Sequence, residues 1–281
     1  MKLLRYGPRG AELPGMLDDT GRIRSLAGVV PDIDGTLLAR LPAELAGIDP
    51  ATLPLVEGDV RLAEPVGRVG KFLCIGLNYI DHAHEAGMPV PAEPIIFTKA
   101  TSSIIGPNDD VLLPPTSVKS DWEVELGVVI GREARYVTPE AALDHVAGLV
   151  LVNDLSEREY QLERGGQWDK GKGCDTFGPF GPWLVTLDEI ANINDLDLWL
   201  DLNGQRMQTG NTDKLIFDVP TVVSYVSQFM SLQPGDIIST GTPPGVGMGM
   251  KPPVWLKEGD VIELGITGLG TQRQQVRRWP G

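Results

Sequence analysis

The feature that most restricts how this chain can fold is a segment in which acidic and apolar residues alternate. Residues 121–131 read Asp-Trp-Glu-Val-Glu-Leu-Gly-Val-Val-Ile-Gly. In a β-strand, residues two apart point to the same side, so Glu123 and Glu125 share one face while Trp122 and Val124 share the other. This alternation predicts a strand that packs its apolar face on a core. An edge strand with one solvated face shows the same pattern, and this simpler interpretation stays open here.

A third carboxylate strengthens the case for a metal site. Asp154 follows an apolar run over residues 147–153, which predicts a buried strand. Asp154 could instead cap the polar, helix-like stretch at 156–164. Carboxylates side by side on strands repel each other, and a hard divalent cation removes that conflict. Three carboxylates on two neighbouring strands therefore predict an oxygen-rich metal site made of Glu123, Glu125 and Asp154.

Further motifs follow in a definite order along the chain. They are the segment from Gly76 to Glu85 (Gly-Leu-Asn-Tyr-Ile-Asp-His-Ala-His-Glu), the pair Glu123 and Glu125, Asp154, Arg158, Gln161, the triplet Gly171-Lys172-Gly173, and Thr240-Gly-Thr242-Pro-Pro-Gly-Val-Gly. From about Lys71 to the C-terminus, the chain resembles the fumarylacetoacetate hydrolase family in these motifs. The opening Met1-Lys-Leu-Leu-Arg-Tyr-Gly-Pro resembles a bacterial branch that hydrolyses 2,4-diketo-3-deoxy sugar acids, such as those from L-rhamnose and fucose.

The resemblance implies a mixed, β-rich α+β fold, namely the β-sandwich or β-roll of that family with short helices and a small N-terminal domain. The sequence agrees, because 34 glycines and 23 prolines favour many turns. We place the small N-terminal domain at 1–65 and the catalytic domain at 66–281. Strands are expected at 2–6, 72–77, 95–98, 111–113, 196–202, 237–238 and 261–264, a hairpin around 18–20, and helices that start at Thr138 and over 219–232.

His82 and Glu85 are three residues apart, and on a helical turn such side chains are neighbours. Glu85 could then orient the imidazole and raise its basicity. The spacing alone favours a solvated polar loop, whereas the resemblance implies a catalytic His–Glu dyad on a mobile lid. Lys172 lies between two glycines, and a surface-loop lysine is the usual interpretation. The resemblance implies that Lys172 is catalytic and contacts the keto oxygen or enolate of the substrate.

Other polar residues are candidates for binding the substrate. Arg158 and Gln161 lie one helical step apart and can face the same site, although a structural ion pair of Arg158 stays possible. Thr242 and the backbone N–H groups of the glycine-rich segment 240–249 could bind the carboxylate of an oxo acid. This segment lacks the Gly-Lys-Ser/Thr of a phosphate loop, and the chain has no Gly-x-Ser-x-Gly. Nucleotide binding and a serine hydrolase mechanism are therefore not expected.

The net charge of −14 argues against a nucleic-acid or anionic-membrane partner. An anionic substrate then needs a local positive centre, which a bound metal, Arg158 and Lys172 would supply. Cys74 and Cys174 are far apart in the sequence, and we expect free thiols in a reducing compartment. No signal peptide and no membrane-spanning run is expected. We therefore predict a cytoplasmic protein, and the resemblance implies a homodimer.

Together, the residues and the resemblance predict a Mg²⁺-dependent enzyme that acts on short 2-oxo acids, and Mn²⁺ also suits the oxygen ligands. The leading hypothesis is hydrolysis of a C–C bond in a 2,4-diketo acid of the acylpyruvate type. The products are pyruvate and a second carboxylic acid, such as lactate from a sugar acid. The same site also suits decarboxylation of oxaloacetate, or an isomerase, hydratase or lyase reaction through the same enolate. A metal-stabilised binding protein is the non-enzymatic alternative.

Overall fold

The computed structural model describes residues 1–41, 43–85, 87 and 89–280. Its strands are β1 (Lys2–Tyr6), β2 (Leu13–Leu17), β3 (Ile23–Ser25), β4 (Leu62–Ala63), β5 (Phe72–Gly76), β6 (Ile95–Lys99), β7 (Ile104–Ile105), β8 (Val111–Leu113), β9 (Ser120–Asp121), β10 (Val124–Ile130), β11 (Val146–Asn153), β12 (Ser156–Glu157), β13 (Gly178–Val185), β14 (Asp197–Leu202), β15 (Gln205–Asn211), β16 (Ile237–Ser239), β17 (Val261–Ile266) and β18 (Gly270–Arg278).

The helices are short. The α-helices are α1 (Gly35–Leu38), α2 (Ile80–Glu85), α3 (Asp169–Lys172) and α4 (Val219–Ser227). The 3₁₀ turns are η1 (Ala43–Leu45), η2 (Pro50–Thr52), η3 (Thr101–Ser103), η4 (Pro139–His145), η6 (Leu187–Glu189), η7 (Thr212–Lys214) and η8 (Gly247–Gly249), and η5 (Glu159–Glu163) is a π-helical turn. In the part of the chain that the structure describes, no helix has the length and apolar character needed to cross a bilayer.

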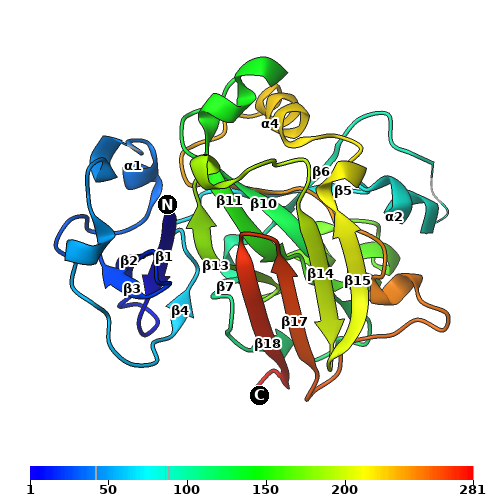
Figure 1. Cartoon of the computed structure of the whole chain (residues 1–281). Coiled ribbons are helices and arrows are strands. Elements are labelled where there is room, and N and C mark those ends of the chain that lie inside the picture. The colour runs from blue at the N-terminus through cyan, green and yellow to red at the C-terminus, as the bar shows by residue number, and fades with distance from the viewer. Residues whose placement is uncertain (42, 86, 88, 281) are drawn as a thin grey trace.

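Two sheets form the body of the protein (Figure 1). The larger sheet has eleven strands, in the order β3-β2-β1-β13-β11-β10-β16-β5-β6, with β4 beside β1 and β7 beside β13. The smaller sheet has five strands, in the order β15-β14-β17-β18-β8, and β9 pairs with β12 in a separate ribbon. Since strands dominate and the helices are short, the expected mixed, β-rich fold is confirmed.

A continuous apolar core lies between the two sheets. Leu126 and Val128 of β10 belong to the same buried cluster as Leu200 of β14 and Leu264 of β17. Each is fully buried, and burial of a side chain of this size stabilises the folded state by roughly 1.5–3 kcal/mol. Successive side chains of a strand point to opposite faces of the sheet, so the residues between Leu126 and Val128 and on either side of them face away from this core.

Strand β10 lies inside the large sheet. It pairs with β11 on one side and β16 on the other, both antiparallel. Trp122 and Val124 are buried in the core between the sheets, while Glu123 and Glu125 lie buried on the opposite side. The predicted alternation is therefore confirmed, and the interpretation as an edge strand with a solvated face is wrong, because neighbouring strands cover both edges and packing covers both faces.

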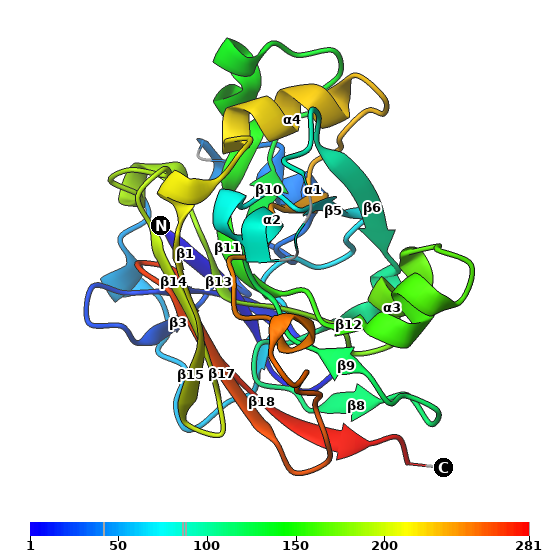
Figure 2. The ribbon, with the colours of Figure 1, turned by 90° about the vertical axis from the view of Figure 1, so that its right-hand side faces the viewer.

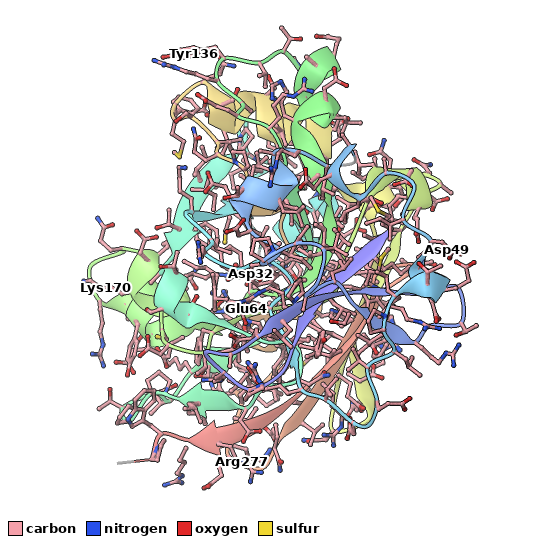
Figure 3. The ribbon with its side chains drawn as sticks, turned by 90° about the vertical axis from the view of Figure 1, so that its left-hand side faces the viewer. Asp32, Asp49, Glu64, Tyr136, Lys170 and Arg277 are labelled. Carbon is pink, nitrogen blue, oxygen red and sulfur yellow. The ribbon has the colours of Figure 1, made fainter. Side chains whose placement is uncertain are left out.

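The N-terminal strands continue the large sheet. Strand β1 pairs with β13, so that β1, β2, β3 and β4 extend the large sheet beyond β13 (Figure 1; Figure 2). The buried guanidinium of Arg5 binds Asp32 at 2.7 Å and Glu64 at 2.8 Å, and Figure 3 labels these two acidic residues. These contacts connect distant parts of residues 1–65 to one another. The domain boundary near residue 65 stays a prediction.

Most expected elements are present, and three differ. The helix expected to start at Thr138 is the 3₁₀ turn η4, and the Thr138 side chain makes no capping hydrogen bond. Helix α4 begins after Asp218, whose side chain accepts a hydrogen bond from the Thr221 N–H, but it ends at Ser227 rather than near 232. The stretch from 156 to 164 is not an α-helix. Its first two residues form β12, since the Glu157 carboxylate accepts the N–H of Lys119 at 2.7 Å and holds this segment against the chain before β9. Both cysteines are free, as predicted.

Candidate active site

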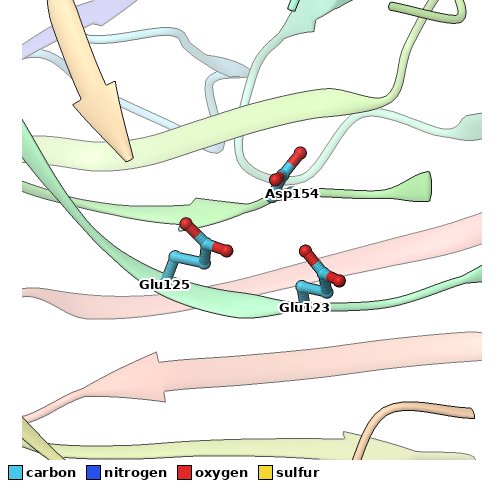
Figure 4. A group of neighbouring side chains, drawn as sticks. All are labelled: Glu123, Glu125 and Asp154. Atoms are coloured by element: carbon cyan, nitrogen blue, oxygen red, sulfur yellow. The ribbon is translucent and has the colours of Figure 1, made fainter. Parts of the chain in front are cut away.

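Three carboxylates meet where β10 begins and β11 ends. Val124 lies opposite Asn153 in the antiparallel pair, so Asp154 comes next to Glu123, and its N–H donates to the Glu123 carbonyl at 2.9 Å. One oxygen from each of Glu123, Glu125 and Asp154 lies within 4.8 Å of the others. Figure 4 shows Glu123 and Glu125 on the same side of their strand, with Asp154 beside them. The sequence prediction that these residues come together is confirmed.

The acidic cluster fits a hard divalent cation. Glu125 accepts hydrogen bonds from the Ser239 hydroxyl at 2.6 Å and the Gly241 N–H at 2.8 Å. Burial raises the pKa of Glu125 well above its usual range, and the charges of Asp154 and Glu123 raise it further. A carboxylate placed in this way needs positive charge to ionise. Three carboxylate oxygens around one point are the ligand type that Mg²⁺ and Mn²⁺ bind.

Lys172 reaches the same cluster from α3. Its Nζ lies 2.5 Å from Glu123 Oε2 and 2.7 Å from Asp154 Oδ2, and the side chain is 2% exposed. Burial disfavours the charged amine, but Asp154 and Glu123 outweigh burial and raise the pKa of Lys172. Gly171 permits this approach, because a Cβ there would lie 2.3 Å from the Glu157 carbonyl oxygen. The interpretation of Lys172 as a surface-loop lysine is therefore wrong.

Arg158 is held between two carboxylates. Its Nε donates to Asp121 Oδ2 at 2.9 Å, its Nη2 to Glu123 Oε1 at 2.6 Å, and its Nη1 to the Gln161 side chain at 3.0 Å. Burial favours the neutral form of Glu123, but Lys172 and Arg158 lower its pKa to about 2. Arg158 and Gln161 thus face one site, as predicted, and the ion pair left open for Arg158 is also present.

Sequence reasoning missed two charged residues of this centre. Lys99 ends β6 and is fully buried, with Nζ 2.6 Å from Asp154 Oδ1 and 2.9 Å from the Leu155 carbonyl. Asp121 is fully buried and accepts the N–H groups of Gly247 at 2.6 Å and Met248 at 3.1 Å. The spacing of two residues between Asp121 and Glu123 was a usable signal, whereas nothing local distinguishes Lys99 from other lysines.

His82 and Glu85 form a hydrogen-bonded pair on α2. His82 Nδ1 lies 3.0 Å from Glu85 Oε2, and the imidazole is buried. The backbone N–H of Gly245 donates to both oxygens of Glu85, at 3.0 and 3.3 Å, which holds the carboxylate against the glycine-rich segment. The predicted proximity is confirmed, and the solvated polar loop is wrong for His82. The other histidine of this helix, His84, is exposed.

Most of the predicted residues line one cavity of about 120 Å³. Its polar lining consists of His82, Glu123, Glu125, Arg158, Gln161, Lys172 and Thr242. Asp154 and Glu85 do not line the cavity, but they contact residues that do: Asp154 binds Lys172, and Glu85 binds His82. The Thr242 hydroxyl donates to the Val124 carbonyl at 2.9 Å and accepts from the Gln208 side chain at 2.8 Å, so its role toward a substrate stays a prediction. The apolar lining was not foreseen.

A β-sandwich that carries a buried acidic centre beside a His–Glu pair points to one class of protein, and comparison with known sequences identifies it. The family described as fumarylacetoacetate (FAA) hydrolase, C-terminal, matches residues 71–277. The chain belongs to this family. A protein from Burkholderia orbicola (strain MC0-3), provisionally named a hydrolase, is 62% identical over 279 residues, which is 99% of each chain.

Solved structures agree with this membership. Fumarylacetoacetate hydrolase from the psychrophile Exiguobacterium antarcticum is 36% identical, with a TM-score of 0.90 over 99% of this chain and 100% of that one. Maleylpyruvate hydrolase from Sphingobium sp. SYK-6, in complex with manganese(II) and pyruvate, is 30% identical, with a TM-score of 0.82 over 99% of both chains. A 2-hydroxyhepta-2,4-diene-1,7-dioate isomerase from Mycobacterium marinum is 31% identical, with a TM-score of 0.77 over 100% of both chains.

Proposed function

We propose that this protein hydrolyses a C–C bond in 2,4-diketo acids of the acylpyruvate type, giving pyruvate and a second carboxylic acid. One observation carries the proposal. A cluster of three carboxylates, a buried lysine and a hydrogen-bonded His–Glu pair all act on one small cavity. The carboxylates suit a metal ion, the lysine stabilises negative charge, and the His–Glu pair accepts a proton.

Glu123, Glu125 and Asp154 are the proposed metal ligands, for Mg²⁺ or Mn²⁺. When bound there, the cation supplies Lewis acidity to the 2-oxo acid end of the substrate. In this chain, the proposal is supported by the three carboxylate oxygens that lie within 4.8 Å of one another. The manganese complex of the Sphingobium maleylpyruvate hydrolase adds support from a relative.

The proposed chemistry begins at His82. Glu85 accepts the Nδ1–H, so Nε2 is left free to take a proton from water as the water oxygen attacks the C4 carbonyl. The C3–C4 bond then breaks, and its electron pair forms the enolate of pyruvate. The Lys172 ammonium stabilises that negative charge, and the proton on His82 returns to C3. Arg158, Gln161 and Thr242 are proposed to bind the substrate.

Two narrower proposals rest on the resemblance alone. The first eight residues suggest a 2,4-diketo-3-deoxy sugar acid such as the rhamnose derivative, which would give pyruvate and lactate. A homodimer is proposed on the same ground, whereas a cytoplasmic location is proposed from the two free cysteines, which suit a reducing compartment.

A second candidate reaction uses the same enolate without attack by water. The Mycobacterium marinum isomerase in this family supports isomerisation of an unsaturated oxo diacid. Decarboxylation of oxaloacetate is a related alternative. These reactions give no new pair of acids, so the products distinguish them from hydrolysis.

The test measures pyruvate release, with Mg²⁺, with Mn²⁺ and with EDTA. The substrates are acetylpyruvate, 2,4-diketo-3-deoxyrhamnonate and oxaloacetate. Hydrolysis predicts metal-dependent release of pyruvate together with a second acid from the diketo acids. The variant His82→Ala should lower kcat by roughly 10²–10⁴-fold, as expected for loss of a general base. The matched control is His84→Ala, on the same helix. Equal activity of His82→Ala and the control would refute the role of His82.

A further inference from the structure

We propose that this site selects acylpyruvates whose acyl group is apolar and uncharged, and rejects those that carry a second carboxylate. The inference rests on the proposed function and adds to it the chemistry of the distal part of the substrate. It comes from the half of the cavity that the proposed reaction does not use.

An apolar wall begins directly at the catalytic lysine. Lys172 Nζ lies over the ring of Phe97, 5.0 Å from its centre. Phe97 in turn contacts Trp168 edge to face, with 5.4 Å between ring centres. Trp168 closes over Gly76, where a Cβ would lie 2.6 Å from Cζ3 of the indole. Phe97, Trp168 and Gly76 all line the cavity, so the lining changes from charged to apolar in one direction.

The rest of this wall is also apolar. The other apolar side chains of the lining are Ile75, Leu77, Leu162 and Met248. If the acid end of the substrate lies at the acidic cluster and Lys172, the acyl group beyond C4 extends along these side chains. Burial of one methylene there strengthens binding by about fourfold. A chain longer than acetyl should therefore be favoured.

Every cation of the cavity lining is already paired with a carboxylate of the protein. Arg158 binds Asp121 and Glu123, and Lys172 binds Glu123 and Asp154. Lys99, behind them, also binds Asp154. A second carboxylate on the substrate would lie against apolar side chains, and both cations among the described lining residues, Arg158 and Lys172, already have carboxylate partners. Burial of an unpaired charge is strongly unfavourable.

The cations nearest in sequence to the wall are also engaged. Lys170 Nζ donates to the Arg164 carbonyl at 2.6 Å, and Figure 3 shows Lys170 at the outer surface. The Arg164 guanidinium pairs with Glu159 at 2.7 Å. Neither side chain lines the cavity. A hydroxylated acyl group is a milder case, because an apolar pocket rejects an added hydroxyl by at most about 10²-fold.

The decisive experiment compares two substrates of equal length on the metal-loaded wild-type protein. Butanoylpyruvate ends in a methyl group, and succinylpyruvate ends in a carboxylate at the same position. We expect kcat/KM for butanoylpyruvate to exceed that for acetylpyruvate by about 15-fold, since it adds two methylenes. For succinylpyruvate we expect kcat/KM at least 100-fold below that for butanoylpyruvate. 2,4-Diketo-3-deoxyrhamnonate should fall between them.

A positive charge introduced into the wall tests the assignment in the other direction. Trp168→Arg should raise the ratio of kcat/KM for succinylpyruvate over butanoylpyruvate by tenfold or more. The control Trp279→Arg, at an exposed tryptophan outside the lining, should leave this ratio unchanged. If Trp168→Arg does not fold, the wild-type ratio decides alone.

The possible outcomes separate the two proposals. Pyruvate release that is as fast from succinylpyruvate as from butanoylpyruvate would overturn the inference while hydrolysis stands. A wild-type preference for succinylpyruvate would also overturn the inference. If Lys170→Met then abolished that preference, Lys170 would be the cation that pairs with the second carboxylate. No pyruvate from any diketo acid, with Mg²⁺ or Mn²⁺, would refute the proposed function, and the selectivity would fall with it.

Discussion

The buried lysine that the sequence did not reveal offers the sharpest test of the acidic centre. Lys99 places its ammonium 2.6 Å from one oxygen of Asp154, while Lys172 lies 2.7 Å from the other. Replacement by methionine keeps most of the side-chain volume and removes the charge. The variant Lys99→Met therefore leaves a buried carboxylate with one of its two cations.

The expected cost follows from this geometry. Loss of one partner of a buried ion pair costs roughly 3–5 kcal/mol, because the remaining charge stays buried. Asp154 keeps Lys172, so we expect the lower end, about 3 kcal/mol. At this chain length about 2 °C of Tm is lost per kcal/mol, which predicts a decrease of about 6 °C. A cation bound by Asp154 would replace part of the missing charge, so excess metal should reduce the decrease.

The assay is thermal unfolding followed by circular dichroism, in EDTA and in excess Mn²⁺. Lys71→Met is the matched control, since Lys71 pairs with the buried Asp236 at 2.5 Å, away from the three carboxylates. Its effect on Tm should be the same in both buffers. The reasoning is refuted if Lys99→Met lowers Tm by less than about 2 °C in EDTA, or if Mn²⁺ does not change its effect.

Three further predictions concern the other carboxylates. Burial and the neighbouring charges raise the pKa of Glu125, so metal binding at a pH below that pKa should release a proton, whereas the variant Glu125→Gln should bind the metal more weakly and release none. Calorimetry in buffers of different ionisation enthalpy measures the number of protons released. Equal proton release by the wild type and the variant would contradict this prediction. Asp121→Asn removes one carboxylate from Arg158 and should lower kcat/KM by roughly 10–100-fold, and a change below twofold would exclude a positioning role. Burial raises the pKa of Glu123, but Lys172 outweighs burial and lowers it from 4.5 to about 2. The ionised Glu123 therefore stabilises the folded state by an amount on the order of 3 kcal/mol above pH 4.5, and this contribution is lost as the pH falls toward 2. Urea unfolding of the metal-free protein between pH 5 and 2 should show this loss, and Glu123→Gln should reduce the slope.

Local pattern was sufficient for the strands and for part of the site. The alternation around Glu123 and Glu125 predicts which face of β10 is apolar, since the direction of a side chain on a strand depends only on its position. The spacing of His82 and Glu85 predicts their contact, because residues three apart are neighbours on one helical turn. The motif order also identified the family, which residues 71–277 match.

Other features exist only because distant segments meet in the folded chain. Lys99 and Asp154 are 55 positions apart, and nothing near Lys99 indicates that its strand ends beside a carboxylate. Trp168 and Gly76 come from different elements, so the apolar wall has no local pattern. Whether a strand lies at an edge or inside a sheet is likewise set by its partners, as β10 shows between β11 and β16. Residue spacing along one element determines which side chains share a face, but only tertiary packing determines what that face meets.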